Sequence, residues 1–563
     1  MLSCLRKANT GSRMSLCMRA MSSNIVKSPY DAPELNTNIV NKPLPHFVMQ
    51  NFLEKDIQDR VALVDGSSGD SRTYRQLYSE THKFAHCLMD MGVKTNDCVG
   101  IMSPNHIHYF TTFQGIALMG ATSTPINPLY TEAEIEFQLK TTSAKMVIAH
   151  PMCIDKVKSV AKKLNIPVLT LGNGDNEAKS VDELIAAQEK TEAVNVEVNP
   201  DSTATVPFSS GTTGVPKGVV LSHRNLVSNI LQLMPQEGRY FGKDGVLMVP
   251  LPFFHIFGMV VGLLVSTHLN VKTVFLPAFD LEKFLQLVQD HKVTRAYVVP
   301  PIILALAKHP LVDKYDLSSL KAILSGAAPL GGDVQEACAT RLNCVVKQAW
   351  GMTELSPAGS CTADDEVTSP SACKGKSGRL VPATEGLIID PMTGEELPPT
   401  EEGELLLRGP QVMQGYLNNE EATKATIRDD GFMHTGDIAK FDNDGWLYIT
   451  DRCKELIKYK GFQVAPAELE AILNTMPVVR DCVVIPVLDD EAGEIPRAYV
   501  ALQPTAEGVT EDNILDFVHE KVAPHKRLRG GVVFVQDVPR SASGKLLRRV
   551  QIAMDREKNQ AKN

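Results

Sequence analysis

Residues 206–223 read Val-Pro-Phe-Ser-Ser-Gly-Thr-Thr-Gly-Val-Pro-Lys-Gly-Val-Val-Leu-Ser-His. The part from Ser209 to Gly218 holds four hydroxyl side chains, three glycines and one lysine, and apolar runs flank it on both sides. Glycines allow close approach of the backbone to a ligand, and exposed N–H groups, hydroxyls and a cation together suit phosphate oxygens. Because Lys217 is followed by Gly218, the stretch is not the common loop G-x-x-x-x-G-K-[ST]. It predicts a phosphate-binding loop of another kind.

This loop resembles the phosphate loop of the acyl-adenylate-forming (AMP-binding) enzymes, a superfamily that includes acid–CoA ligases, insect luciferases and peptide-synthetase adenylation domains. The resemblance implies that the loop binds the β- and γ-phosphates of ATP. The ATP-binding candidates in the loop are Ser209, Ser210, Gly211, Thr212, Thr213, Gly214 and Lys217.

The composition is that of an ordinary globular protein with more than one domain, with 563 residues, 43% hydrophobic and 22% charged. A formal net charge of −9 argues against a nucleic-acid partner. The 11 cysteines contain no C-x-x-C pair, which indicates free thiols in a reducing compartment. The uncharged run Val246–Ser266 is long enough to span a bilayer, but prolines interrupt it. We expect a buried strand and helix there, and no transmembrane segment.

Strand-like and helix-like segments alternate along most of the chain, which favours parallel sheets covered on both faces. The phosphate loop is expected between a strand over Ala204–Phe208 and a helix that begins near Ser222. Short strands over Gly386–Ile389 and Glu404–Leu407 predict a small β-subdomain. The predicted fold is α/β. A large domain of doubly wound parallel sheets with the β-subdomain (31–452) is followed by a small mobile α+β domain (453–563).

The first 30 residues are predicted to be a mitochondrial transit peptide. They contain several serines and no acid before Asp31. Their five basic residues are Arg6, Lys7, Arg13, Arg19 and Lys27. A disordered tail is the alternative for this segment. The alternative locations are the cytoplasm, or a peroxisome reached without a Ser-Lys-Leu signal.

A second constellation combines Ser325-Gly-Ala-Ala-Pro-Leu330 with Gln348-Ala-Trp-Gly-Met-Thr-Glu354. A small-residue turn lets a flat ring lie on the backbone, and Trp350 can cover the other face of the ring. Thr353 offers a hydroxyl for phosphate, and Glu354 offers a carboxylate for Mg²⁺. The resemblance implies that this region binds adenine, phosphate and metal. The nucleotide-site candidates are Ala327, Gln348, Ala349, Trp350, Gly351, Met352 and Thr353, with Glu354 as the metal ligand.

The third and fourth constellations lie nearer the C-terminus, in His434-Thr-Gly-Asp437, residues 445–464 and Ser543-Gly-Lys545. The resemblance assigns the ribose hydroxyls to Asp437 with Arg452 beside it. It implies that Lys454 is the hinge between the domains and that Lys545, on a mobile loop, is the adenylation lysine. The candidates for the second half-reaction and coenzyme A are Lys458, Lys460, Gly461 and Gln463.

The fifth motif is Pro252-Phe-Phe-His-Ile-Phe-Gly-Met259, which matches the acyl-site motif of ligases and luciferases and makes His255 an acyl-site candidate. The chain departs from the plant 4-coumarate–CoA ligases at three positions. They have Tyr at Phe257, often have Lys at Leu324, and have a CoA-contacting Lys at Ala278. The two apolar replacements favour a hydrocarbon acid over a hydroxycinnamate, and the third puts one CoA contact in doubt.

Taken together, the motifs predict an ATP-dependent ligase that joins a small carboxylic acid to CoA through an acyl-adenylate, with Mg²⁺. The resemblance is nearest to the 4-coumarate–CoA ligase and luciferase branch. The catalytic candidates are Lys545, His255, Lys458, Thr353 and Glu354. A luciferase-like oxygenase and a non-catalytic acyl- or nucleotide-binding protein stay open as alternatives, although retention of Lys545, Glu354 and Asp437 argues against the second. The sequence leaves open the acid, its chain length, and whether the chain is a monomer or a homodimer.

Overall fold

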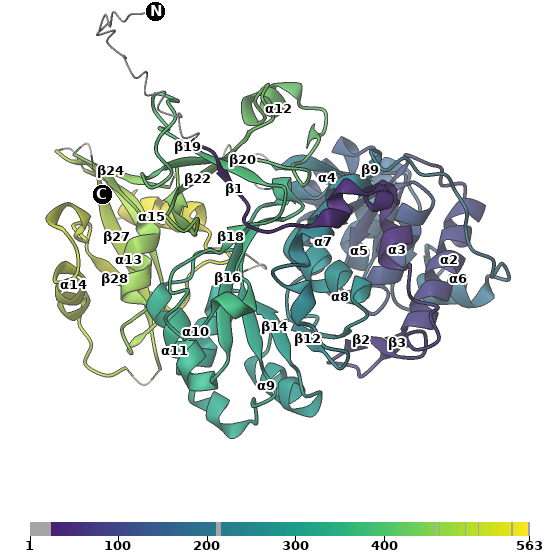
Figure 1. Ribbon diagram of the computed structural model, residues 1–563, viewed down its shortest axis with the longest axis horizontal. Coiled ribbons are helices and arrows are strands. Elements are labelled where there is room, and N and C mark those ends of the chain that lie inside the picture. The colour runs from purple at the N-terminus through teal and green to yellow at the C-terminus, as the bar shows by residue number, and fades with distance from the viewer. Residues whose placement is uncertain are drawn as a thin grey trace, which may run out of the picture.

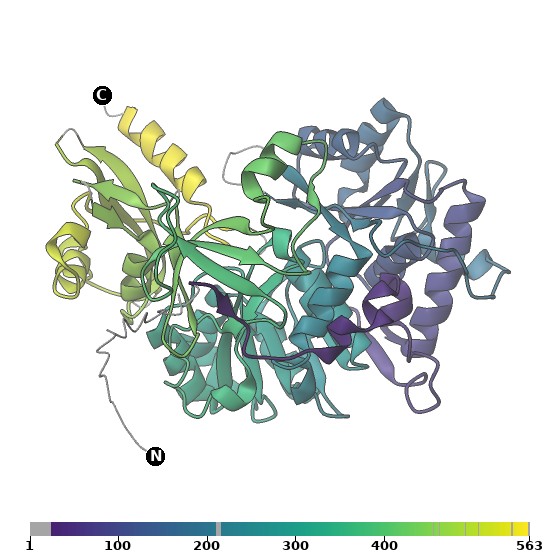
Figure 2. The same ribbon diagram turned by 45° about the horizontal axis from the view of Figure 1, so that its top comes forward.

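A computed structural model of the protein describes residues 24–209, 216–453, 455–460, 462–489, 491–504, 506–541 and 544–560. Within these ranges the chain forms two nine-stranded and two five-stranded sheets (Figure 1). The N-terminal sheet and the C-terminal unit lie at opposite ends of the molecule in both views (Figure 2). The mixed α/β fold confirms the predicted fold class.

The first nine-stranded sheet has the order β10-β11-β9-β5-β4-β6-β7-β8, and β21 pairs with β11. Its strands are β4 Cys98–Met102, β5 Thr122–Ile126, β6 Met146–Ala149, β7 Val168–Thr170, β8 Ala178–Ser180, β9 Thr203–Thr205, β10 Phe208–Ser209, β11 Lys217–Ser222 and β21 Gly415–Tyr416. Its helices are α2 Tyr74–Asp90, α3 Tyr109–Leu118, α4 Glu132–Thr141, α5 Ile154–Leu164 and α6 Val181–Ala187. The side chains of successive residues of β4 point to opposite faces of the sheet. Ile101 packs in one core with α2 and α3, and Met102 packs in another with α4 and α5.

The second nine-stranded sheet has the order β18-β17-β16-β15-β14-β12-β13-β2-β3. Its strands are β2 Val61–Asp65, β3 Ser71–Thr73, β12 Val246–Val249, β13 Lys272–Phe275, β14 Arg295–Val298, β15 Ala322–Ser325, β16 Val345–Gly351, β17 Ala358–Cys361 and β18 Arg379–Leu380. Its helices are α1 Leu44–Val48, α7 His223–Leu233, α9 Leu281–Asp290, α10 Pro300–Lys308 and α11 Gly332–Leu342. The inner strands of both large sheets pair in parallel, as predicted, whereas β3, β17, β18 and the β10–β11–β21 edge are antiparallel.

The uncharged run after residue 246 folds as predicted, with a strand followed by a buried helix. The strand β12 leads through a turn into a π-helix over Phe257–Leu264, which continues as α8 Val265–His268. Every residue of the π-helix is buried, which explains why the run carries no charge. Among the described helices, none has both the length and the apolarity that a membrane crossing requires.

The predicted strand-to-helix junction at the phosphate loop is wrong. The loop connects two antiparallel strands, with Phe208 opposite Gly218 and Ser209 opposite Lys217. The strand β11 then runs on to Ser222, whose side chain caps the start of α7. A strand forms after the loop because the apolar residues of β11 are needed between β9 and β21. The loop residues 210–215 themselves lie outside the described ranges.

The predicted β-subdomain is an antiparallel sheet of β1 Val26–Lys27, β19 Glu385–Ile389, β20 Gly403–Arg408, β22 Met433–Phe441 and β23 Leu447–Arg452, with α12 Glu420–Thr426 nearby. Its first strand corrects the prediction of a tail that extends to residue 30. Val26 pairs with Gly386, and the Ser28 hydroxyl donates to the Leu380 carbonyl at 2.8 Å. Residues 26–28 are therefore part of the fold, and residues 1–23 of the predicted transit peptide lie outside the described ranges.

The C-terminal unit has its own sheet, with the order β25-β24-β27-β26 and β28 beside β27. Its elements are β24 Ile457–Tyr459, β25 Phe462–Val464, α13 Pro466–Leu473, β26 Val479–Asp489, β27 Gly493–Leu502, α14 Glu511–His519, β28 Val532–Phe534 and α15 Arg548–Gln560. Leu469 and Leu473 of α13 pack with Val484 and Val500 in a core separate from that of the large sheets. This separate core suits a unit that moves as a body.

Candidate active site

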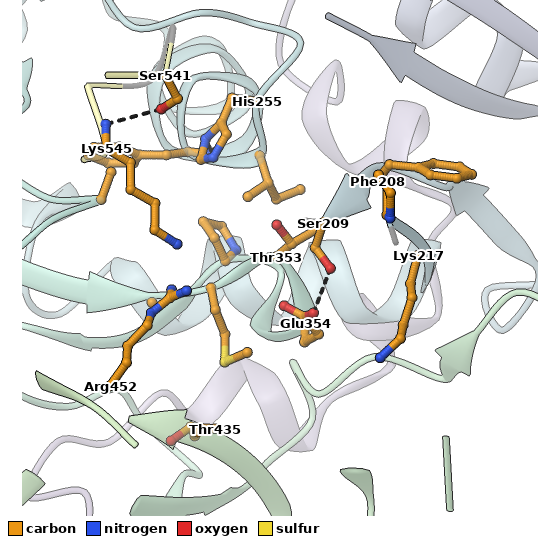
Figure 3. A pocket seen from close by; sticks show the side chains of 18 of the residues that line it. Phe208, Ser209, Lys217, His255, Thr353, Glu354, Thr435, Arg452, Ser541 and Lys545 are labelled. Carbon is orange, nitrogen blue, oxygen red and sulfur yellow. Dashed lines mark hydrogen bonds between the residues drawn. The ribbon is translucent and has the colours of Figure 1, made fainter. Parts of the chain in front are cut away.

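One cavity of about 1140 Å³ collects most of the described residues that the sequence nominated (Figure 3). The predicted residues that line it are Ser209, Lys217, His255, Ala327, Ala349, Trp350, Gly351, Met352, Thr353, Glu354, Arg452 and Lys545. The described candidates that do not line it are Gln348, Asp437, Lys458 and Lys460. The candidates outside the described ranges are Ser210, Gly211, Thr212, Thr213, Gly214, Lys454 and Gly461.

The carboxylate of Glu354 stands at the phosphate-loop end of the cavity, on a 3₁₀ turn directly after β16. Its Oε1 accepts hydrogen bonds from the Ser209 hydroxyl at 2.9 Å and from the Tyr416 hydroxyl at 3.0 Å. The Lys217 Nζ lies 4.9 Å from the centroid of the Tyr416 ring, a cation–π distance. Burial and the neighbouring carboxylate raise the pKa of Tyr416, so its hydroxyl stays protonated as a donor.

The donor set around Glu354 fits Mg²⁺ held jointly with phosphates. The described residues offer no cluster of three or more His, Cys, Asp or Glu side chains that could hold a metal. Mg²⁺ in nucleotide sites is usually bound by one or two carboxylates plus substrate phosphates and water. A single carboxylate, only 4% exposed and close to Lys217 and Ser209, matches that mode of binding.

The end of the cavity that the sequence predicts to bind adenosine is built from β16 and the β22–β23 pair. The Trp350 indole donates from Nε1 to the Asp437 carboxylate at 2.9 Å, and Arg452 lies 3.4 Å from the other oxygen of Asp437. Burial raises the pKa of Asp437, and the charge of Arg452 opposes that rise. Asp437 therefore orients both Trp350 and Arg452 from behind the cavity wall. Gln348 likewise lies beneath the wall, where its amide donates to Leu330 and Gln335.

The small-residue turn after β15 has an unusual backbone conformation. Ala327 adopts a left-handed conformation with φ of 71°, which non-glycine residues rarely accept, and it faces the cavity. A side chain on Gly326 would come within 3.1 Å of the Phe257 ring. The turn therefore presents bare backbone to the cavity and packs directly on the Phe257 ring.

The third region of the cavity is apolar, with one half-buried imidazole. His255 accepts from the Phe257 backbone N–H at 3.3 Å. Burial, with the charge of Lys545 nearby, lowers the pKa of His255 to about 4, so the imidazole is neutral at pH 7. The apolar residues that line this region of the cavity are Leu233, Ile256, Phe257, Val261, Leu324 and Pro357.

Lys545 enters the same cavity from the C-terminal unit, on a loop fixed by its own hydrogen bonds. The Ser541 hydroxyl accepts from the Lys545 N–H at 3.1 Å, and Arg540 donates to the Gly544 carbonyl at 2.6 Å while it pairs with Asp481. Burial, reinforced by the positive charge of Arg452, lowers the pKa of Lys545 to about 8. The ammonium group is thus held in a partly dehydrated position facing Thr353 and Glu354 (Figure 3).

Two residues nominated for the second half-reaction, Lys458 and Lys460, lie outside the cavity. Lys458 is exposed on β24, and its backbone N–H donates to Glu494 at 2.8 Å. Lys460 pairs with Glu491 at 2.6 Å, and Gln463 stands opposite Lys458 on β25. The structure therefore separates the two sets of candidates, with Lys545 inside and Lys458 outside.

Several cavity residues were not nominated from the sequence. The most informative is Tyr416, which contacts both Glu354 and Lys217. Its signal was the segment Gln414-Gly-Tyr-Leu-Asn418, which resembles plant ligases but suggested no role by itself. Others are Phe208, Glu404, His434, Arg540 and Ser541. Phe208 and His434 lie in motifs quoted above, but those motifs assigned them no role, and the contacts of all five depend on how separate elements meet.

Comparisons with known proteins agree with this geometry. The model of the family described as AMP-binding enzyme matches residues 51–417, and that of the AMP-binding enzyme C-terminal domain matches residues 468–545. The chain is 40% identical to 4-coumarate–CoA ligase 1 of Petroselinum crispum over 512 residues, which covers 90% of this chain and 93% of the relative.

Two solved structures have closely similar folds. ATP-bound MatB from Rhodopseudomonas palustris superposes with a TM-score of 0.82 at 29% identity, over 91% of this chain and 99% of that one. The o-succinylbenzoate CoA synthetase MenE from Bacillus subtilis, solved with its acyl-adenylate intermediate, gives a TM-score of 0.76 at 26% identity, over 90% and 97% of the two chains.

Proposed function

The chain belongs to the AMP-binding enzyme family, and from this membership we propose that it is an ATP-dependent carboxylic acid–CoA ligase that works through an acyl-adenylate. The observation that carries the proposal is that one cavity holds Lys545 together with Lys217, Glu354 and an apolar pocket. A carboxylate oxygen bonds to the α-phosphorus of ATP, and pyrophosphate leaves. The CoA sulfur then bonds to the acyl carbon, the bond from that carbon to the AMP oxygen breaks, and AMP leaves.

In the first step the residues of this chain bind and neutralise charge. Lys217, Ser209 and the loop between them hold the β- and γ-phosphates. Thr353 offers its hydroxyl to phosphate, and Glu354 would hold Mg²⁺, which supplies positive charge to the phosphate oxygens when bound. Lys545 lies where charge develops on the α-phosphate and the acid, and preorganised cations at such positions lower the barrier. Neutral His255 lines the acyl pocket and presents no charge to the carbonyl.

In the second step a different face of the C-terminal unit is needed. Residues 453–563 turn about the hinge near residue 454 against residues up to 452. The turn withdraws Lys545 and brings Lys458, Lys460 and Gln463 toward the CoA path. Hinge motions of this kind exchange one catalytic face for another. The exposed position of Lys458 in the present arrangement supports this division of labour.

The acid is proposed to be aliphatic or a simple aryl acid without a hydroxyl. The Petroselinum relative is named for 4-coumarate, but in this chain the pocket walls include Phe257 and Leu324. Burying a substrate hydroxyl without a partner costs about 1–3 kcal/mol, which corresponds to a ten- to hundredfold loss in selectivity. The pocket therefore favours hexanoate, laurate or cinnamate over 4-coumarate.

Mitochondrial import is proposed for the basic N-terminal segment. Because Val26 and Ser28 belong to the folded sheet, the removable part ends before them. A fluorescent protein fused to residues 1–40 should enter mitochondria. A fusion that stays diffuse in the cytosol would refute this location.

The ligase activity is tested with a panel of acids. The purified chain is incubated with ATP, Mg²⁺ and CoA, and AMP, pyrophosphate and free thiol are measured for hexanoate, laurate, cinnamate and 4-coumarate. The expected result is acid-dependent release of AMP with equal loss of thiol. Oxygen uptake without thiol loss would indicate the oxygenase alternative, and no turnover with any acid would indicate a binding protein.

A further inference from the structure

The helix α10 of the large sheet makes a charged contact with the C-terminal unit. Its last residue, Lys308, donates from Nζ to the backbone carbonyls of Asn474 at 2.7 Å, Met476 at 2.8 Å and Val479 at 3.4 Å. The donor and the acceptors are at least 166 residues apart in the sequence. The Lys308 ammonium group thus donates all three of these hydrogen bonds to the C-terminal unit.

One of the three acceptors lies at a helix end, where a cation is favourable. Asn474 is the C-cap of α13, and the last carbonyls of a helix lack intrahelical partners and carry partial negative charge. Lysine side chains near a helix end stabilise these carbonyls. The end of α10 itself is served by a different residue, because Arg341 donates to the Leu306 and His309 carbonyls at 3.1 and 3.0 Å. Lys308 is therefore not required to cap its own helix.

The other end of α10 touches the loop that carries Lys545. Val299 is the N-cap of α10, and a side chain on Gly544 would come within 2.8 Å of its Cγ2 atom. The two ends of one nine-residue helix, about 13 Å apart at 1.5 Å per residue, thus hold two separate points of the C-terminal unit. One point is the end of α13, and the other is the residue before Lys545.

We propose that Lys308 is a positioning residue that docks the C-terminal unit in the arrangement that places Lys545 in the cavity. The inference rests on the proposed ligase function. The carbonyls of Asn474 and Met476 move away from α10 when the unit turns, so the contact supports adenylate formation and opposes the transition to thioester formation. A contact shifts the equilibrium between the two arrangements of the C-terminal unit only if it is more favourable in one of them, and the Lys308 contact favours the adenylate-forming arrangement.

The test measures the two half-reactions separately in Lys308→Met, which keeps the length of the side chain and removes its charge. Acid-dependent exchange of labelled pyrophosphate into ATP should fall by about tenfold, as expected when a charged contact no longer biases a two-state equilibrium. Thioester formation from supplied acyl-adenylate and CoA should not fall. Lys308→Arg should restore exchange. Lys314→Met, on the exposed turn after α10, is the matched control and should behave like the natural chain.

Equal loss of both half-reactions in Lys308→Met, or unchanged exchange, would overturn the proposal. Absence of exchange in the natural chain would instead overturn the proposed function. A second variant does not depend on Lys308. A side chain on Gly331 would lie 3.2 Å from the Ala471 Cβ, so Gly331→Cys with Ala471→Cys can form a disulfide across the same interface. Oxidation should preserve exchange and block thioester formation until reductant is added, whereas unhindered thioester formation in the oxidised variant would contradict the docking.

Discussion

Replacement of Lys545 by Ala should disable adenylate formation and spare thioester formation. The Lys545 side chain lies half-buried in the cavity, and Arg452 is the cation that most affects its pKa. Loss of one preorganised charge at a reacting centre costs about 2.7–4 kcal/mol, or a 10²–10³-fold drop in rate. Because Arg452 stays in place, we expect a loss in this range rather than complete inactivation. Lys458 is exposed on β24, so Lys458→Ala should leave the rate of adenylate formation near that of the natural chain.

The pKa of Lys545 also predicts how the rate of adenylate formation depends on pH. With a pKa of about 8, the ammonium form dominates below pH 8 and disappears above it. Because the kcat/KM profile reports groups of the free enzyme, kcat/KM for ATP in pyrophosphate exchange should fall about tenfold per pH unit above that point. Lys545→Arg should abolish the fall, since a guanidinium stays charged.

The assays are acid-dependent pyrophosphate exchange and thioester formation from supplied acyl-adenylate, with circular dichroism to verify folding. Equal losses of both steps in Lys545→Ala would show that Lys545 does not act in adenylation alone. A flat pH profile in the natural chain would refute the assignment of the titrating group.

Three further changes have defined outcomes. Tyr416→Phe removes the hydroxyl that donates to Glu354, and a hydrogen bond to a charged group contributes about 1.5–3 kcal/mol, so pyrophosphate exchange should fall at least tenfold. An unchanged rate would show that Tyr416 has no role in the site. Phe257→Tyr should raise kcat/KM for 4-coumarate relative to cinnamate, and no change in that ratio would refute the pocket argument. Deletion of residues 2–24 should leave Tm unchanged, whereas deletion of residues 2–30 should lower it by removing β1, and equal Tm values would contradict the pairing of that strand.

The interior of the fold was predictable because local patterns and tertiary packing agree there. β19 Glu385–Ile389 and β20 Gly403–Arg408 lie within one residue of the strands predicted over Gly386–Ile389 and Glu404–Leu407, since each is a short apolar run with clear end signals. The predicted strand-to-helix junction at the phosphate loop is wrong, and the phosphate chemistry of the loop stays a prediction. Its hairpin lacks a short turn sequence such as Asn-Gly, and the strand β11 exists because β9 and β21 flank it.

The candidate site was likewise predictable only where the local sequence carries the information. Motifs identified Glu354, Trp350 and Lys545 because the residue types themselves suit phosphate, adenine and negative charge. The contacts of Tyr416 and Lys308 were not predictable, because each depends on how separate sheets meet. Lys308 in particular is one lysine at the end of an apolar helix, and only the position of α13 gives it partners.

The most direct test of the acyl-adenylate pathway is to follow the oxygen atoms of the acid. The natural chain is given hexanoate labelled with ¹⁸O in both carboxylate oxygens, together with ATP, Mg²⁺ and CoA, and the products are examined by mass spectrometry. Attack of the carboxylate on the α-phosphorus, followed by thiolysis at the acyl carbon, leaves one ¹⁸O in AMP and one in the acyl-CoA, with none in pyrophosphate. Acyl-CoA formed while the label appears in inorganic phosphate or pyrophosphate, and AMP stays unlabelled, would contradict an acyl-adenylate.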